Sequence, residues 1–273
     1  MEIFDCHTHI YPEPIAQKAS DSIGGFYGIS MHHSGSAEEL SSACRAAGIA
    51  KEVVCSAAVT PKQVHSINDF IAAQCASHPD FIGLGTLHTG FDEYAAENDN
   101  GNGVKCAVDE VERMISLGLH GVKLHPDMQL FNVDDERLFP AYEAMQGRLS
   151  LLVHAGDYRT DFSHPRRIRH IKELFPRLTV IAAHFGGWSV PEIALDHLKD
   201  TDCFFDVSSS ISFTGKRRAA ELIRIYGAER MLFGSDFPMW DPQEELDTFR
   251  QLGLSINEER MILSENPLRA FGL

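Results

Sequence analysis

The sequence of 273 residues is short of positive charge and contains no long hydrophobic run. Its 24 lysines and arginines face 39 aspartates and glutamates, which leaves a formal net charge of −15 at pH 7. This balance argues against nucleic acid and anionic membrane surfaces as partners, because both attract a net positive field. No apolar run approaches the ~20 residues of a membrane-spanning helix, and the first residues lack the basic start and apolar core of a secretory signal. We therefore expect no nucleic-acid partner and no membrane segment.

The six cysteines include no C-x-x-C pair, which excludes a zinc ribbon and a thioredoxin-type redox motif. Scattered cysteines in a large acidic chain are typical of a reducing compartment, so we expect a cytoplasmic protein. The 44% of hydrophobic residues and 23% of charged residues are ordinary for a globular chain with a sizeable core. Disordered, collagen-like and coiled-coil architectures are thereby excluded.

Short apolar runs rich in β-branched residues recur along the chain and predict eight strands, with helical segments between them. Eight strand-helix units, in a chain near the usual ~250 residues, predict a (β/α)8 TIM barrel that forms a single α/β domain over residues 1–273. A doubly wound open sheet is the alternative, which the lack of a G-x-G-x-x-G turn weakens. The expected strands are Ile3–Cys6, Glu52–Ala57, Phe81–Leu87, Gly121–Leu124, Ser150–Val153, Thr179–Ala183, Cys203–Val207 and Met231–Gly234.

Two connections after strands, the first and the third, are longer than the others. They comprise residues 10–35 and 88–105, and both belong to the side of a barrel that carries catalytic groups. The second connection contains Asn98-Asp99-Asn100-Gly101-Asn102-Gly103, a composition typical of a mobile loop. We interpret it either as a lid over the site or as a tolerated surface insertion. Serines followed by glutamate three residues later predict helix starts at Ser36, Ser189 and Ser255.

Histidines near the predicted strand ends are the most informative feature of the sequence. His7 and His9 are two residues apart, so in an extended strand both rings point to one face, and Asp5 has the same parity. In a barrel that face is the interior. Two neutral imidazoles directed at one point are preferred ligands of zinc and other transition metals, although a lone H-x-H motif is weak evidence.

The other strand ends strengthen this interpretation. The fourth, fifth, sixth and eighth predicted strands are each followed by a histidine or an aspartate, and catalytic residues of barrels come from that location on several strands. A structural core histidine explains any one of these residues but not their convergence with an H-x-H motif. The pattern therefore predicts a metal site. These residues are His125, His154, His184 and Asp236.

The sequence resembles the amidohydrolase superfamily, and more narrowly its amidohydrolase-related branch, which includes aminocarboxymuconate-semialdehyde decarboxylase and γ-resorcylate decarboxylase. The resemblance covers nearly the whole chain and is specific for the branch, but not for a substrate or a reaction. The motifs that carry it are Asp5-Cys6-His7-Thr8-His9, Gly121 to Pro126, His154, His184-Phe185-Gly186-Gly187, Gly234 to Pro238 and the closing Asn266 to Leu273.

The resemblance implies that one divalent metal is bound by four ligands, His7, His9, His154 and Asp236. Zinc is the first expectation and manganese the second, because mixed nitrogen and oxygen ligands suit both. His184 would then lie beside the metal-bound water or substrate and would orient the substrate or act as a general acid or base. Asp236 can also accept a proton.

Lys123 and His125 share one face of the fourth predicted strand. Other branches of the superfamily use a carboxylated lysine here to bridge two metals, whereas one metal is usual in the branch that this chain resembles. A barrel lysine paired with a carboxylate is the alternative. His125 is expected either to contact substrate or to form a hydrogen bond behind the metal ligands.

Further polar and aromatic residues follow the strand ends. Asp206 is positioned to orient the ring of His184 or to make an ordinary structural hydrogen bond. Arg159 could hold a substrate carboxylate through a bidentate pair, and a solvated surface arginine is the alternative. Trp188 and Trp240 are candidates for substrate contacts.

Two reactions fit this set of residues. The leading expectation is hydrolysis of an amide, ester or lactone by a metal-activated water that loses its proton to Asp236. The alternative is nonoxidative decarboxylation of an aromatic or enolic carboxylic acid, in which a proton is delivered to carbon as carbon dioxide leaves. Both reactions act on a small molecule and use the same ligands.

Three other expectations complete the prediction. Deoxyribonucleases of the TatD type and phosphoesterases of the polymerase-and-histidinol-phosphatase type also begin with H-x-H, but the fourth and eighth predicted strands here lack their glutamate and their aspartate-histidine ligands. A nonenzymatic metal-binding protein is a further alternative. Twofold oligomers are common, so we expect a homodimer.

Overall fold

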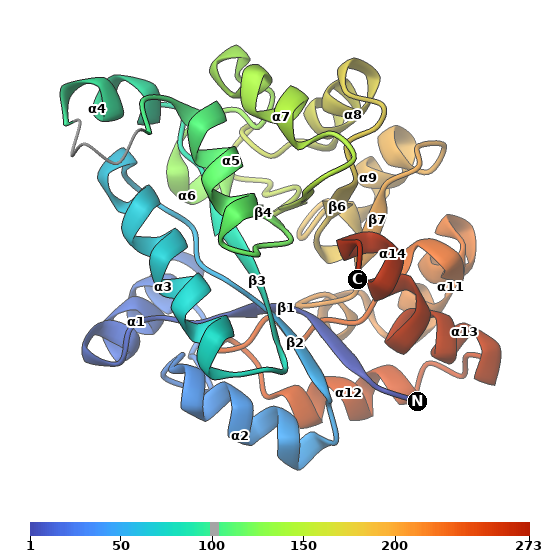
Figure 1. Ribbon diagram of the computed structural model, residues 1–273. Coiled ribbons are helices and arrows are strands. Elements are labelled where there is room, and N and C mark those ends of the chain that lie inside the picture. Colours follow the sequence, from blue (N-terminus) through green and yellow to red (C-terminus); the bar gives the residue numbers. More distant parts are fainter. Residues whose placement is uncertain (99–103) are drawn as a thin grey trace.

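The computed structural model describes residues 1–98 and 104–273, and its centre is a parallel β-sheet (Figure 1). Within these ranges the sheet has eight strands in the order β1 to β8, each paired in parallel with the next. The strands alternate with helices, as the sequence predicts. The strands are β1 Phe4–His9, β2 Lys51–Cys55, β3 Phe81–Thr86, β4 Gly121–Leu124, β5 Ser150–Val153, β6 Val180–Ala182, β7 Phe204–Asp206 and β8 Met231–Leu232.

The last strand and the residues after it return to the first strand. Cys6 N donates to Phe233 O at 2.8 Å, and His9 N donates to Phe237 O at 2.7 Å. Asp236 N donates to His7 O at 2.8 Å. These bonds bring the two edges of the sheet together in a nearly closed barrel. The predicted (β/α)8 TIM barrel is confirmed, and the doubly wound open sheet is excluded.

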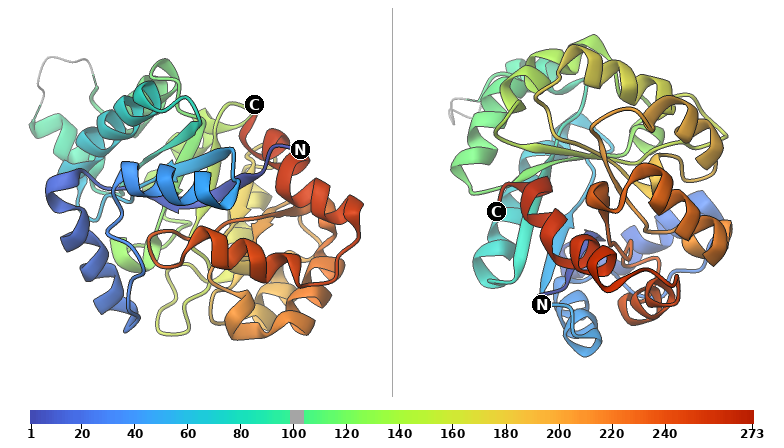
Figure 2. Two further views of the ribbon diagram at one scale, coloured as in Figure 1. Left: turned by 90° about the horizontal axis from the view of Figure 1, so that it is seen from below. Right: turned by 90° about the vertical axis from the view of Figure 1, so that its right-hand side faces the viewer.

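Helices surround the barrel on its outside (Figures 1 and 2). Two of the three predicted serine caps are confirmed, since Ser36 Oγ accepts from Glu39 N at 3.2 Å and Ser255 Oγ accepts from Glu258 N at 3.3 Å. The third is wrong, because α9 begins after Val190. The α-helices are α1 Ala16–Tyr27, α2 Ala37–Ala47, α3 Val64–Ser77, α4 Phe91–Glu97, α5 Ala107–Ser116, α6 Pro126–Gln129, α7 Phe139–Met145, α8 Pro165–Leu174, α9 Pro191–Leu198, α10 Ile211–Thr214, α11 Lys216–Tyr226, α12 Pro242–Arg250, α13 Ile256–Arg260 and α14 Asn266–Phe271.

Shorter helical turns complete the chain. The two long connections predicted after β1 and β3 contain helical structure of their own, α1 in the first and α4 in the second. The tip of the second connection, where the composition suggests a lid, lies outside the described residues. The short turns are η1 Glu13–Ile15, η2 Pro61–Gln63, η3 Glu136–Leu138, η4 His184–Gly186, η5 Ala228–Arg230 and the π-helical η6 Met261–Glu265.

Two hydrophobic layers stabilise the barrel. The larger layer fills the space between the strands and the surrounding helices, and the smaller one occupies the lower interior of the barrel. Helix α14 covers the N-terminal ends of β4 and β5, because His120 Nδ1 lies 3.2 Å from Phe271 O and Ser150 Oγ donates to Ala270 O. The inner layer consists of Phe4, Cys6, Val53, Cys55, Ile82, Leu84, Leu152, Ile181, Ala183, Leu232, Ala270 and Phe271.

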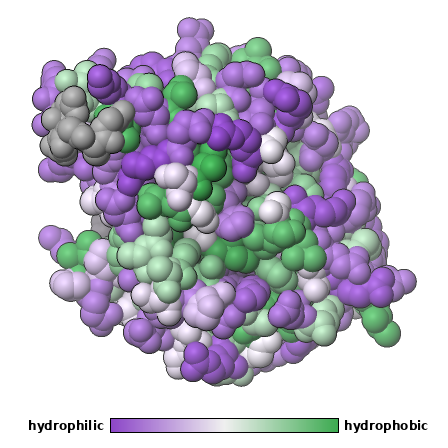
Figure 3. Space-filling view, viewed as in Figure 1, coloured by the Kyte–Doolittle hydropathy of each residue, from purple (hydrophilic) through white to green (hydrophobic). Residues whose placement is uncertain are grey.

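The face of the molecule shown in Figure 3 carries a band of hydrophobic residues across its middle, with hydrophilic residues around it. Within the described parts of the chain, every helix is too short or too polar to span a lipid bilayer.

Candidate active site

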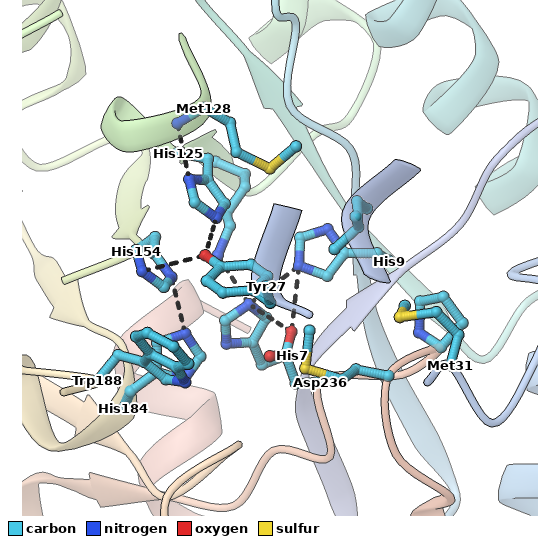
Figure 4. A pocket seen from close by; sticks show the side chains of 14 residues that line it. His7, His9, Tyr27, Met31, His125, Met128, His154, His184, Trp188 and Asp236 are labelled. Atoms are coloured by element: carbon cyan, nitrogen blue, oxygen red, sulfur yellow. Dashed lines mark hydrogen bonds and ion pairs between the residues drawn. The ribbon is translucent and has the colours of Figure 1, made fainter. Parts of the chain in front are cut away.

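Side chains from the C-terminal ends of five strands meet in one cavity of about 30 Å³ (Figure 4). This is the rim on which barrel enzymes carry their reacting groups. The sequence predicted most of these residues, and the structure brings them together. The predicted residues that line the cavity are His7, His9, Lys123, His125, His154, His184, Trp188 and Asp236.

Three of them form a compact group of potential metal ligands. His7 Nε2 and His9 Nε2 are 3.2 Å apart, and Asp236 Oδ1 lies 3.5 Å from the first and 3.4 Å from the second. Ligands at 2.0–2.1 Å from a tetrahedral zinc ion are ~3.3 Å from one another. An octahedral ion with similar bond lengths separates neighbouring ligands by ~3.0 Å. The three donors therefore fit a divalent metal, and their spacing suits either geometry.

The ring of His7 is oriented by the buried carboxylate of Asp206, which lies 3.0 Å from its Nδ1. With Nδ1–H donating to this carboxylate, the lone pair of Nε2 faces the group of three donors. A carboxylate behind a histidine ligand is a recurrent feature of metal sites. Burial, with Lys123 nearby, lowers the pKa of His7 to about 4, so the ring is neutral at pH 7.

His9 has the opposite electrostatic setting. Burial alone would lower the pKa of His9. The neighbouring Cys55 and Asp236 outweigh this effect and raise the pKa to about 9. Cys55 Sγ lies 3.6 Å from His9 Nδ1. The surrounding histidines hold the pKa of Asp236 well below its usual value despite its burial. In the metal-free protein His9 and Asp236 are therefore an ion pair.

The first strand does not place Asp5 with these residues, so the predicted common parity with His7 and His9 is wrong. The register of β1 against β2 shifts between Asp5 and Thr8. A shift of this kind redirects the side chains beyond it. Asp5 Oδ1 instead accepts from Ser235 N at 2.9 Å, while the adjacent Cys6 belongs to the inner hydrophobic layer.

His154, the fourth predicted ligand, faces the cavity but lies outside the compact group of three. Its Nδ1 is 3.1 Å from His184 Nε2, and its Nε2 is 3.3 Å from the hydroxyl of Tyr27. The ring stacks on that of His125 with centroids 4.1 Å apart. Burial lowers the pKa of both stacked rings well below 6.5, so both are neutral at pH 7.

His184 is held by backbone contacts. Its Nδ1 lies 2.9 Å from Ser208 O, and its backbone N donates to Asp206 Oδ1 at 3.0 Å. Asp206 thus contacts the ring of His7 and the backbone of His184. The distance from Asp206 Oδ1 to His184 Nδ1 is 3.9 Å, which is too long for a hydrogen bond to the His184 ring. His184 and Asp236 both adopt positive φ, 59° and 60°, a conformation that residues other than glycine rarely take outside functional sites.

Lys123 is fully buried in the barrel, and its Nζ lies 2.7 Å from His7 Nε2. Burial lowers its pKa from the ordinary 10.5. Among the described residues, no carboxylate lies within ion-pair distance of this amine, so the predicted pairing with an acid is wrong. The amine faces the lone pair that a metal at His7 would use.

The predicted substrate-contacting residues differ in their placement. Trp188 lines the cavity. Trp240 does not, but its Nε1 donates to Ser209 Oγ at 2.7 Å. The Ser209 hydroxyl in turn donates to Asp236 Oδ2 at 2.5 Å and so links Trp240 to the site. Arg159 is neither free for a substrate carboxylate nor fully solvated. It binds both carboxylate oxygens of Asp157, through Nε at 2.9 Å and Nη2 at 2.5 Å.

Several lining residues were not predicted. The most notable is Tyr27 at the end of α1, whose hydroxyl is 2.8 Å from His125 Nε2 and is drawn between His125 and His154 in Figure 4. The length of the connection after the first strand was the only signal for it. The remaining unpredicted residues around the cavity are Ile23, Met31, Met128, Pro238 and Met239.

The structure defines a barrel protein whose histidines and aspartate converge at the rim where barrel enzymes carry their reacting groups, and comparison with known families identifies its family. A family model described as amidohydrolase matches residues 4–273. The chain therefore belongs to the amidohydrolase family, and the resemblance seen in its motifs is confirmed.

Three solved structures illustrate the shared fold. A TIM-barrel protein of Bordetella bronchiseptica is 21% identical, with a TM-score of 0.76 over 100% of this chain and 99% of that chain. The 5-carboxyvanillate decarboxylase of Sphingomonas paucimobilis is 16% identical, with a TM-score of 0.72 over 100% and 99%. A dihydroxybenzoic acid decarboxylase of Polaromonas sp. JS666, solved with manganese and 2-nitroresorcinol, is 16% identical, with a TM-score of 0.72 over 100% and 97%.

Proposed function

We propose that this protein is a metal-dependent decarboxylase that removes carbon dioxide, without oxidation, from an aromatic or enolic carboxylic acid. The observation that carries the proposal is the convergence of His7, His9 and Asp236 on one point, with further buried imidazoles around the same small cavity. The decarboxylases among the structural relatives support this reaction over hydrolysis.

His7, His9 and Asp236 would hold the metal, with His154 as the fourth ligand of the family pattern. When bound, the metal supplies a Lewis acid for the oxygens of the substrate. Zinc and manganese both suit these donors, and manganese is to be tested first because two relatives were solved with it.

His184 is the proposed proton donor. Its Nδ1 is fixed on Ser208 O, which leaves Nε2 directed toward His154 and the cavity. In the reaction the bond between the ring carbon and the carboxylate carbon breaks, and its electron pair stays on the ring carbon. The proton carried on Nε2 of His184 bonds to that carbon in place of the lost carbon dioxide.

Hydrolysis of an amide, ester or lactone is the second candidate. The observation that favours it is the ionised carboxylate of Asp236 beside His9, which could take a proton from an attacking water. The low pKa of Asp236 makes it a weak base, and for this reason we place hydrolysis second.

The test is to load the protein with manganese or zinc and supply separate panels of hydroxybenzoates and of lactones, amides and esters. Decarboxylation predicts release of carbon dioxide and, in D2O, one deuterium at the vacated carbon. A His184→Asn variant should bind metal normally and lose most of this turnover. Turnover of the second panel without any release of carbon dioxide would establish hydrolysis instead.

A further inference from the structure

A second and much larger chamber adjoins the cavity that holds the reacting groups. It has a volume of about 340 Å³ and lies between α1, the end of β2 and α3. Four residues line both spaces, so the chamber shares a wall with the candidate active site. The shared residues are His9, Ile23, His125 and Met128.

The cavity at the metal-ligand group is too small for the body of a substrate. Its volume of about 30 Å³ is far below the ~150 Å³ of a dry cavity that accommodates benzene. It can therefore hold a reacting group but not a ring. The chamber of about 340 Å³ falls within the range of ~300–1,000 Å³ that is typical of small-molecule pockets.

The walls of the chamber are mostly apolar, and the described residues that line it include no lysine, arginine, aspartate or glutamate. Three of its polar members already have partners. Ser56 Oγ donates to Ile10 O at 2.5 Å, Ser66 Oγ donates to Gln63 O at 3.0 Å, and Gln63 Oε1 accepts from Thr60 N at 2.9 Å. The apolar members are Pro12, Ile15, Ala19, Ile23, Ala57, Val59, Ile67, Phe70 and Met128.

The chamber also has an exposed apolar border. Ile15 is 51% exposed and Val59 is 42% exposed, and both side chains line the chamber. A ligand body that extends from the reaction cavity through the chamber would cover both residues.

We propose that the chamber binds the uncharged, apolar body of the substrate, and that this body is longer than a single ring. This inference rests on the proposed decarboxylase function, because it places the reacting carboxylate at the metal-ligand group. A dry cavity of ~150 Å³ accommodates benzene, so a chamber more than twice that size takes two rings or a ring with an alkyl chain. Its described walls hold no lysine or arginine, and His9 would be neutral as a metal ligand, so the chamber offers no cationic partner to a second anionic group in the metal-loaded protein.

The experiment compares 2-hydroxybenzoate with 4-alkyl-2-hydroxybenzoates, whose chains point directly away from the carboxylate. Affinity is measured by calorimetry on metal-loaded protein, and release of carbon dioxide is measured separately. Burial of each methylene should tighten binding about fourfold, so a butyl chain should give a gain on the order of a hundredfold.

Two variants fill the chamber from opposite walls. Ala19→Phe does so from α1 and Ser66→Trp from α3, and Ser66 is exposed, so its replacement should not disturb folding. Gln17→Phe places the same aromatic ring on α1 outside the chamber and serves as the matched control. We expect the filling variants to reduce the gain from the butyl chain to less than tenfold while 2-hydroxybenzoate binds as before.

The outcomes separate this inference from the proposed function. Equal affinity for short and long compounds, or an undiminished gain in both filling variants, would overturn the chamber assignment even if carbon dioxide is released. The filling variants could selectively lose affinity for the long-chain compounds while no compound releases carbon dioxide. That result would support the chamber as a binding site and reject the decarboxylase function.

Discussion

Metal binding should release one proton per metal ion near neutral pH, and that proton should come from His9. The pKa of His9 is raised to about 9, so this ring is protonated in the metal-free protein at pH 7, whereas a ligand must be neutral. His7, with a pKa lowered to about 4, and the ionised Asp236 contribute no proton in this range.

The sign and size of the pH effect follow from this single proton. As the pH falls below 9, protons compete more strongly with the metal for His9, so affinity should fall about tenfold per pH unit. Between pH 8 and pH 6 the dissociation constant should rise about a hundredfold, and above pH 9 it should level off. Isothermal titration calorimetry in buffers of different ionisation enthalpy measures both the affinity and the number of protons released.

Cys55→Ala is the matched variant, because Cys55 contacts His9 and is not a predicted ligand. Its loss should move the pKa of His9 back toward 6.5, so fewer protons should be released at pH 8. A dissociation constant that does not change between pH 6 and pH 8, or release of two protons in the wild type, would refute this reasoning.

Four other measurements test the site and the fold. Protein purified without chelators should contain about one zinc or manganese per chain by elemental mass spectrometry, and a value near two would instead indicate that Lys123 is carboxylated and bridges two ions. Asp206→Asn should weaken metal binding about 10- to 100-fold, because His7 loses the carboxylate that orients its ring. The circular dichroism spectrum should stay unchanged. An unaltered metal affinity would contradict this role of Asp206. Tyr27→Phe should lower kcat about 10- to 100-fold and leave metal affinity nearly unchanged, whereas equal kcat values would show that the hydroxyl takes no part in the reaction. Burial raises the pKa of Glu52 from 4.5 to about 8, so between these pH values the folded chain binds more protons than the unfolded chain and its stability falls as the pH rises. In metal-free protein, Glu52→Gln should therefore increase the free energy of unfolding in urea by about 1–2 kcal/mol at pH 9 and by little at pH 5. Equal gains at both pH values would argue against this origin.

The barrel was predictable because its signals are local. Apolar runs, serine caps and strand-helix alternation are encoded within a few residues, and they predicted every strand to within a few positions. Ser189 failed as a cap because its hydroxyl accepts from Tyr158 N at 2.8 Å, a contact between segments far apart in sequence.

The arrangement within the site was less predictable, since it depends on contacts across the barrel. The parity argument placed Asp5 with the two histidines, and no residue pattern reveals the register shift in β1 that separates them. Asp206 could be assigned to the correct region but not to His7, which lies 199 positions away in sequence.

Residues from long connections were the hardest to predict. Tyr27 reaches the site from a helix that packs over the barrel, and neither its type nor its position marks it as a partner of His125. Arg159 has the chemistry to bind a substrate acid, but Asp157, two residues earlier, occupies its guanidinium.

The hydrocarbon layer at the base of the barrel has a consequence for how the site exchanges protons with solvent. Leu152, Ile181 and Leu232 are buried beneath the histidines, and α14 covers the same end of the barrel. This apolar layer lies between the His184 ring and the lower end of the barrel, so His184, as the proposed proton donor, would be protonated again through the upper opening, which the substrate occupies during turnover. Each turnover in D2O would then add one deuterium to the product, because the proton donor can be protonated again only after the product has left.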